Sequence, residues 1–466
     1  MSRGIKSVIL SVGWIFSVIC GCTLNHAYLP PKASIPTSWS MQGKIYTHAK
    51  YAQHELWWHN FHDPLLSDLL EHNAMNNLDI KIAQARVATA NAEYAIAIAQ
   101  FFPQIGGTAL PPNGTGLDTL TQVVALTASI EPDFFGRLSG KRKYTAANLA
   151  ALKAIQNFSL FNLQAAVAGA YMELRETQAI NKILQHNLRA NTQVLNLLKS
   201  SYKSGLTNYL DIAQQESLLE VQLADLERNQ SVITAILHKI EGLTGNNPGV
   251  LSKKLLAYKP IPTIAQSINL NTPATLLRRR QDIIAAERRV AATHANIDIA
   301  IANLFPKITL GWLLGWQTKT IASSIFALQN ADSTFFGLFD APIINLALHK
   351  IVTMREREQA IAVIQYQKTV LQALHDVAIQ YNYYQHYQAS AMHLKKATDH
   401  KRTVLLLAKD TYRKGVTNFN TVLQAETDLN NLEISWVHTL AMQQIAVINL
   451  YKALGGGPAI QANKKH

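Results

Sequence analysis

Two very long stretches of the chain, about 137–204 and 345–414, contain no proline and combine wide apolar faces with Gln, Asn, Ser and Thr. This pattern predicts helices with one wet side, each roughly 100 Å long at 1.5 Å per residue. Each ends at a glycine, and an asparagine three positions later can cap a returning helix of about 39 residues. These residues stand at matching places in both stretches: Gly205, Asn208, Gly415 and Asn418. The pattern therefore predicts two antiparallel helical hairpins.

Shorter Ala-rich helices are predicted upstream of both hairpins, at about 64–101 and 273–304, and each stops at a Phe-Pro pair. Strand-like segments follow each Phe-Pro pair. In the second half, KITLGWLLGWQT and STFFGLFDAPII predict a β-hairpin, with alternate apolar positions over 308–314 on one face. The first-half version is weaker, because QIGGTAL is a poor strand and LPPNGTG is expected at the hairpin tip.

The two halves are one unit written twice. SYKSGLTNYLDIAQQESLLE (201–220) aligns with TYRKGVTNFNTVLQAETDLN (411–430). AQARVATANAEYAIAIAQFFPQI (83–105) aligns with AERRVAATHANIDIAIANLFPKI (286–308), so the order of matches is the same in both halves. The expected divisions are a signal peptide 1–21, a lipid-anchored N-terminal segment 22–62, a first repeat 63–245, a linker 246–272, a second repeat 273–455 and a C-terminal tail 456–466.

The predicted strands constrain the assembly. Strands inside a bilayer must close into a barrel, because no open edge survives there. Bacterial membrane barrels need at least about eight strands, so the four predicted here cannot close within one chain. We therefore expect several copies to share one barrel. The alternative is a small soluble β-region that caps a helical bundle.

The N-terminus resembles a bacterial lipoprotein signal. Arg3 and Lys6 precede the apolar run VILSVGWIFSVI, which is too short to span a bilayer as a helix. The phrase ICGC follows, with small Gly21 directly before Cys22, and resembles a lipobox in which Cys22 becomes the acylated first residue. The mature chain would then contain one cysteine and no internal disulfide. The alternative is an uncleaved signal anchor.

Composition narrows the function further. The formal net charge is +13, which suits an acidic partner or an anionic membrane surface, but no nucleic-acid motif is present. No HExxH, GxSxG or paired catalytic carboxylates are found, and LGGGP (454–458) lacks the lysine of a phosphate loop. His54, His59 and His62 match no zinc spacing. We therefore expect neither an enzyme nor a cofactor or metal site.

Several phrases together resemble one known family, the TolC-type outer-membrane efflux channels, and within it the lipid-anchored NodT-like branch that serves RND pumps. The resemblance covers nearly the whole mature chain. The phrases that carry it, besides the two turn phrases, are WWHNFHDPLLSDLL (57–70), SIEPDFFGR (129–137), LLRRRQDIIAAERRVAATHANI (276–297), LFPKITL (304–310) and APIINL (341–346).

The resemblance implies a mainly α fold with a membrane β-barrel contribution. A homotrimer would share a twelve-stranded barrel in the outer membrane and project a long helical tunnel into the periplasm. It also implies a passive conduit that exports small molecules, with a periplasmic adaptor and an inner-membrane RND pump as partners and outer-membrane lipid around the anchor. Two alternatives remain: a type I secretion outlet of the same fold, and a helical structural lipoprotein without a lumen.

The resemblance also implies two functional regions. The hairpin turns would form adaptor-docking tips, made of Tyr202, Lys203, Gly205, Leu206, Thr207, Tyr412, Arg413, Gly415, Val416 and Thr417. A pore constriction would lie just past the tips, at Asp211, Gln214, Thr421 and Gln424. Because two of these four positions are glutamines and one is a threonine, we expect closure by packing and hydrogen bonds more than by repelling charge. The alternative is that Asp211 only complements a helix N-terminus.

Overall fold

The computed structural model describes residues 28–32, 34–39, 56–73, 76–113, 121–264, 273–319, 329–342 and 345–456. Cys22 lies outside these residues. The chain divides into two compact units. The strand unit comprises Met1–Ser34, Ala85–Ile155 and Asp282–Thr369, and the hairpin unit comprises Ile35–Gln84, Gln156–Gln281 and Val370–His466. Within the described part of the chain, none of the helices is both long enough and apolar enough to cross a membrane.

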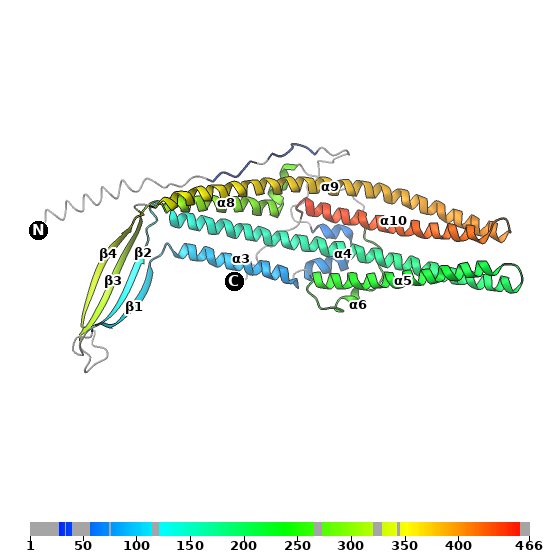
Figure 1. Ribbon diagram of the computed structural model, residues 1–466, viewed down its shortest axis with the longest axis horizontal. Coiled ribbons are helices and arrows are strands. Elements are labelled where there is room, and N and C mark those ends of the chain that lie inside the picture. The colour runs from blue at the N-terminus through cyan, green and yellow to red at the C-terminus, as the bar shows by residue number, and fades with distance from the viewer. Residues whose placement is uncertain are drawn as a thin grey trace. The chain divides into compact units, whose positions relative to one another are not determined.

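The strand unit contains an antiparallel four-stranded sheet in the order β1-β2-β3-β4 (Figure 1). Its strands are β1 Gln104–Asn113, β2 Thr121–Ile130, β3 Lys307–Lys319 and β4 Gln329–Asp340. Each neighbouring pair is antiparallel, and β2 pairs with β3 over ten residue positions without a register shift. Among the described residues, strands β1 and β4 form the two edges, so the sheet within one chain is open on both sides.

The second β-hairpin forms as predicted, although β4 begins earlier than the sequence pattern indicated. Gly311 on β3 stands opposite Phe336 on β4, and the Phe336 ring lies over the space that a side chain at Gly311 would fill. A Cβ atom there would come within 2.2 Å of the Phe336 ring, so any larger residue at this position would have to displace that ring.

The expectation for the first β-hairpin was wrong. Leu110, Pro111, Pro112 and Asn113 belong to β1 and not to the hairpin tip, and β1 is a regular partner of β2 from Gln104 onward. A register shift separates Leu110 from Asn113, at the two prolines. Proline lacks a backbone N–H, and it is tolerated here because β1 is an edge strand of the sheet in one chain.

The long helices and the returning helices form as predicted. Their bounds are α4 Arg137–Lys203, α5 Tyr209–Leu243, α9 Leu346–Arg413 and α10 Phe419–Ala453. At its N-terminus α4 is capped by Asp133, whose carboxylate accepts from the Leu138 and Ser139 amides at 2.8 and 2.7 Å. The absence of internal proline and these caps explain why such long helices persist.

The shorter helices differ from the prediction, because each is broken near its start. In the first half the chain forms α2 Pro64–Asp68, the π-helix η2 Leu69–Asn73 and α3 Leu78–Ala99. In the second half it forms η4 Pro273–Thr275, α7 Leu276–Arg279 and α8 Gln281–Ala302.

Tertiary hydrogen bonds explain both breaks. The side-chain oxygen of Asn77 caps α3 by accepting from the Asp79 amide at 2.8 Å, while its Nδ2 donates to the Leu243 carbonyl at 2.9 Å. Arg280 occupies the corresponding break, and its Nη1 donates to the Ala453 carbonyl at 3.2 Å. Each break thus fastens a short helix to the end of the returning helix of its own half.

A buried network ties the N-terminal segment and the linker to α4 inside the hairpin unit. Tyr171 donates to the Asp63 carboxylate at 2.5 Å, and Arg175 donates to the Tyr171 hydroxyl at 2.9 Å. Arg175 also donates to the Ala257 carbonyl at 2.9 Å, just past the short helix α6, Ser252–Leu255. Arg175 is fully buried, so these contacts offset part of the free-energy cost of removing its charge from water.

An aromatic cluster supports the same region. The 3-10 helix η1, Trp57–Phe61, places Trp57 in a stacked contact with Tyr451 of α10, with ring centroids 5.8 Å apart. Trp57 and Trp58 are both buried. The end of the second repeat therefore packs on the segment that precedes the first.

Candidate functional site

The first hairpin tip is a tight, internally hydrogen-bonded turn. Gly205 has φ of 71°, a backbone conformation that favours glycine, and its amide donates to the Tyr202 carbonyl at 3.0 Å. The Leu206 amide donates to the Ser201 carbonyl at 2.9 Å, which completes a Schellman cap of α4. Asn208 then caps α5 by accepting from the Asp211 amide at 2.9 Å.

The second tip repeats this geometry. Gly415 has φ of 72°, and its amide donates to the Tyr412 carbonyl at 2.9 Å. The Val416 amide donates to the Thr411 carbonyl at 2.9 Å, and Asn418 accepts from the Thr421 amide at 3.2 Å. The repeated phrase therefore encodes the same turn twice.

The tip residues that the sequence singled out lie at the ends of the hairpins. Leu206 is 80% exposed and Val416 is 72% exposed. Lys203, Gly205, Arg413 and Gly415 are also exposed, and the two threonines, Thr207 and Thr417, are partly buried. The rings of Tyr202 and Tyr209 meet edge-on with their centroids 6.2 Å apart, and the ring centroids of Tyr412 and Phe419 are 5.4 Å apart. Two apolar side chains at the ends of tight turns thus face outward without cover from the described residues.

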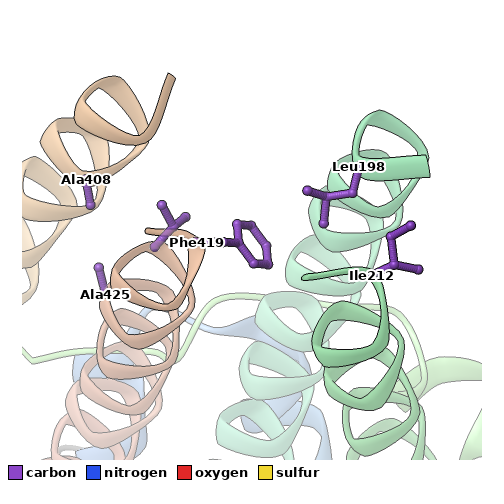
Figure 2. Close-up of a cluster of buried hydrophobic side chains, with 6 residues drawn as sticks. Leu198, Ile212, Ala408, Phe419 and Ala425 are labelled. Carbon is purple, nitrogen blue, oxygen red and sulfur yellow. The ribbon is translucent and has the colours of Figure 1, made fainter. Parts of the chain in front are cut away.

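A buried apolar cluster joins the two hairpins just behind the tips (Figure 2). Phe419 of α10 projects toward Leu198 of α4 and Ile212 of α5. Val422, Ala425 and Ala408 complete the cluster from the second hairpin. Burying Phe419, which is 3% exposed, fastens the hairpins together within one chain.

A polar layer lies beyond this cluster, and the sequence analysis did not identify it. Asn191 of α4, Gln215 of α5 and Glu426 of α10 are all buried between the hairpins. Gln215 Nε2 donates to the Asn191 carbonyl at 3.0 Å. In the amide orientation that gives both of its atoms a partner, Asn191 donates to Glu426 Oε2 at 3.0 Å. Further along, Asn187 of α4 donates to Asn430 of α10 at 2.8 Å.

The proposed constriction residues on the first hairpin have local partners. Asp211 accepts from the Thr207 hydroxyl at 2.6 Å, in the first turn of α5, where its charge also complements the helix dipole. Gln214 is partly buried, one turn further along α5. The structure thus places both near the tip and gives Asp211 a structural role.

On the second hairpin, the two positions predicted to line a constriction, Thr421 and Gln424, are neutral, and an acidic residue follows them. Thr421 bonds to the Asn418 side chain, and Gln424 Nε2 donates to Asp428 at 2.8 Å. Lys401 pairs with Asp428 at 2.7 Å. The hydrogen bonds from Lys401 and Gln424 lower the pKa of the Asp428 carboxyl. Asp428 is therefore ionised but already paired.

The described residues form no cluster of three or more His, Cys, Asp or Glu side chains that could hold a metal ion. What the region offers is two solvent-exposed apolar tips, a contact between hairpins and several buried amides.

The known proteins to which this chain is similar are outer-membrane proteins. The pyoverdine export outer membrane protein OpmQ of Pseudomonas putida is 29% identical over 452 residues, which cover 92% of this chain and 93% of the relative. The probable outer membrane lipoprotein SilC of Salmonella typhimurium is 26% identical over 464 residues, covering 97% and 99%. The solved outer-membrane channel OprN superposes with a TM-score of 0.82 at 26% identity, covering 94% of this chain and 99% of that structure.

Long helical hairpins joined to an open antiparallel sheet, matched end to end by solved channels, define an outer-membrane channel protein. The chain belongs to the outer membrane efflux protein family, whose sequence profile matches residues 69–246 and 272–456. It is a non-enzymatic transporter, the outer-membrane channel component of a tripartite efflux pump. The resemblance to TolC-type outer-membrane efflux channels is therefore confirmed, and so is the predicted mainly α fold with four strands in each chain.

Proposed function

We propose that three copies of the chain form one passive conduit by sharing a twelve-stranded barrel. The observation that carries this proposal is the sheet that is open at both β1 and β4. An open edge inside a bilayer would leave backbone N–H and C=O groups without partners, and four strands are too few to close. Three copies supply twelve strands, with β4 of one copy beside β1 of the next.

The internal duplication supports a matching contact between the helical hairpins of different copies. Phe419 packs on the first hairpin within the chain, whereas Tyr209, its counterpart in the first repeat, is 63% exposed. If the contact between hairpins repeats around the assembly, the α9/α10 hairpin of the next copy covers the face of α5 that begins at Tyr209. The hairpins would then enclose a continuous lumen, and the repeats 63–245 and 273–455 would act as equivalent wall segments.

The exposed tips are the proposed docking surface for a periplasmic adaptor. Leu206 and Val416 offer apolar contact at the ends of rigid turns, and small glycines at 205 and 415 allow a partner helix to approach closely. Lys203 and Arg413 add positive charge beside them. An inner-membrane RND pump, linked through that adaptor, would supply the energy.

The cargo is proposed to be small molecules moved from the periplasm to the exterior. The relative OpmQ is named for pyoverdine export, and TtgC of Pseudomonas putida is named for toluene efflux. The narrow region past the tips, at Asp211, Gln214, Thr421 and Gln424, would control passage. Acylation of Cys22 would anchor the chain in the outer-membrane lipid, as the name of the relative SilC suggests for that protein.

Single-channel recording in planar bilayers, together with the mass of the detergent-extracted particle, tests the conduit. We expect discrete conductance steps from a particle with the mass of three chains. A monomeric particle, or a trimer that never conducts, would contradict the proposal and favour a helical tether.

Adaptor docking is tested separately, by co-purification with the cognate adaptor. Leu206→Asp combined with Val416→Asp should abolish co-purification while the conductance steps persist. Leu206→Val combined with Val416→Leu, which keeps both tip side chains apolar, is the matched control and should retain the adaptor. Retention of the adaptor by the double variant would overturn the docking assignment.

A further inference from the structure

Glu426 is an acidic side chain buried where two helical hairpins meet. It is 9% exposed and stands on the face of α10 that contacts the first hairpin. Such a position removes a carboxylate from water, which is costly unless charge or hydrogen bonds compensate. The groups around Glu426 therefore decide which protonation state the packed hairpins accept.

One opposite charge and several neutral amides face Glu426. From α9, Lys409 Nζ approaches Oε1 at 3.8 Å, and it is the only charged side chain that faces this carboxylate among the described residues. From α4 the facing group is the Asn191 amide. From α5 come Gln215 and Gln222, which bracket that amide and carry no charge.

The layer also contains an acceptor that lacks a partner. Gln215 Oε1 is buried and accepts no hydrogen bond from the described residues. A neutral carboxyl can donate a hydrogen bond, whereas an ionised one can only accept. Protonation of Glu426 would in addition leave the layer without a buried charge to compensate.

We propose that Glu426 is a protonation-controlled latch between the two helical hairpins. In its neutral form it packs in the polar layer and holds α10 against α4 and α5. In its ionised form it is drawn toward water and toward the ammonium of Lys409, 3.8 Å away, and the contact between the hairpins loosens. The latch lies next to the Phe419 cluster, so loosening it weakens the fastening of the tips.

The direction of the pH dependence follows from burial. Burial raises the pKa of the Glu426 carboxyl above its usual range, and Lys409 offsets only part of that effect. A group whose pKa is raised in the packed state stabilises packing fully below its unpacked pKa, about 4.3 for glutamate. That stabilisation is lost progressively as pH rises through the raised pKa of the packed state.

The chain contains its own control. Glu216 holds the corresponding position in the first repeat, and Lys199 pairs with it at 2.8 Å, with both side chains well exposed. It therefore shares the sequence spacing and the lysine partner of Glu426 but lacks burial. A pH effect that comes from burial should depend on Glu426 and not on Glu216.

The test uses the full chain with Asn187→Cys and Asn430→Cys, because these two side chains touch across α4 and α10 at 2.8 Å. The rate of disulfide formation is measured between about pH 5 and pH 8 in three backgrounds: otherwise unchanged, Glu426→Gln and Glu216→Gln. The thiolate fraction rises with pH alike in all three, so rates are compared as ratios to the unchanged background at each pH.

For Glu426→Gln we expect a ratio near one at the lowest pH that rises several-fold toward the highest, because the neutral amide keeps the hairpins packed. For Glu216→Gln the ratio should stay near one throughout. A flat ratio for Glu426→Gln, or the same rise in both variants, would overturn the latch.

The consequence for conduction rests on the proposed channel and is measured separately. Single-channel conductance should rise with pH in the unchanged protein and lose that dependence in Glu426→Gln. A pH-dependent trapping ratio with a pH-independent conductance would support the latch and contradict only its coupling to the pore.

Discussion

The two helical hairpins come from one repeated sequence unit, yet their facing surfaces differ. At matching positions, Phe419 is 3% exposed and Tyr209 is 63% exposed. Lys409 and Glu426 are 3.8 Å apart in a buried layer, whereas Lys199 and Glu216 are 2.8 Å apart near solvent. The turns themselves are nearly identical. Residues within the turn thus determine its conformation, whereas packing against the neighbouring hairpin determines whether a given side chain is buried or exposed.

A second pair of matching positions shows the same divergence. Tyr171 and Arg175 in the first repeat correspond to Tyr381 and Gln385 in the second, and in each pair the later residue donates to the tyrosine hydroxyl, at 2.9 and 3.0 Å. Only Arg175 reaches further, to the Ala257 carbonyl. Among the described residues, this pair therefore holds the linker in the first repeat and not in the second.

The largest expected effect concerns Phe419. Phe419→Ala should lower the free energy of unfolding by about 3 to 5 kcal/mol, because it empties the cluster between the hairpins. If the copies assemble as proposed, Tyr209→Ala should mainly reduce the detergent stability of the trimer. Helical circular dichroism on heating, with native gels for assembly, separates the two. A helical melting loss in the dissociated Tyr209→Ala chain equal to that of Phe419→Ala would contradict the comparison.

The next largest effect is expected at the buried Arg175. Arg175→Met should destabilise the linker contact by about 3 kcal/mol, because the linker carbonyl and the Tyr171 hydroxyl lose a charged donor. Tryptic cleavage at Lys253 and Lys254 should accelerate by about a hundredfold, if cleavage follows local opening. Gln385→Met is the matched control and should leave cleavage unchanged. Equal cleavage of both variants would show that Arg175 does not hold the linker.

A smaller and symmetrical effect is expected at the helix caps. Asn208→Ala and Asn418→Ala should each cost about 1 kcal/mol, since each removes one side-chain acceptor from the first turn of a returning helix. Denaturant unfolding of the two variants side by side measures this. A difference between them much above about 0.5 kcal/mol would mean that the turns are not equivalent.

The smallest effect is expected from charge at the proposed constriction. Multivalent cations should block conductance only weakly, because Gln424 and Thr421 are neutral and Asp428 is already paired with Lys401. Gln424→Ala should leave block unchanged in planar bilayers, and Asp211→Asn serves as its counterpart in the first repeat. Strong block that Gln424→Ala abolishes would refute this account.

Elements governed by local chemistry could be predicted from the sequence. The glycine and asparagine of each turn act within a few residues, and a proline-free stretch with caps suffices for a long helix. The breaks at Asn77 and Arg280 could not be predicted, because their partners, Leu243 and Ala453, lie far away in sequence. The prediction placed the two prolines of β1 at the hairpin tip for a related reason. Proline is tolerated in an edge strand, and the pairing of the whole sheet determines which strand lies at an edge.

The candidate site likewise contains residues that could be predicted from the sequence and residues that could not. The tip residues could be located from the turn phrase alone. The buried layer around Glu426 could not, because Lys199–Glu216 and Lys409–Glu426 have the same spacing and only one pair is buried. Which copy of a duplicated motif becomes buried depends on packing between repeats, and identical local patterns carry no information about it.

The tip turns limit how another protein can recognise them. The amides of Gly205, Leu206, Gly415 and Val416 all donate to carbonyls of their own turn. A partner therefore cannot extend these turns by backbone pairing, as strand addition would require. Recognition must therefore come from the shape and the side chains of the turn. The same turn occurs twice in each chain. A partner with a repeated binding helix could therefore recognise both turns with one kind of surface.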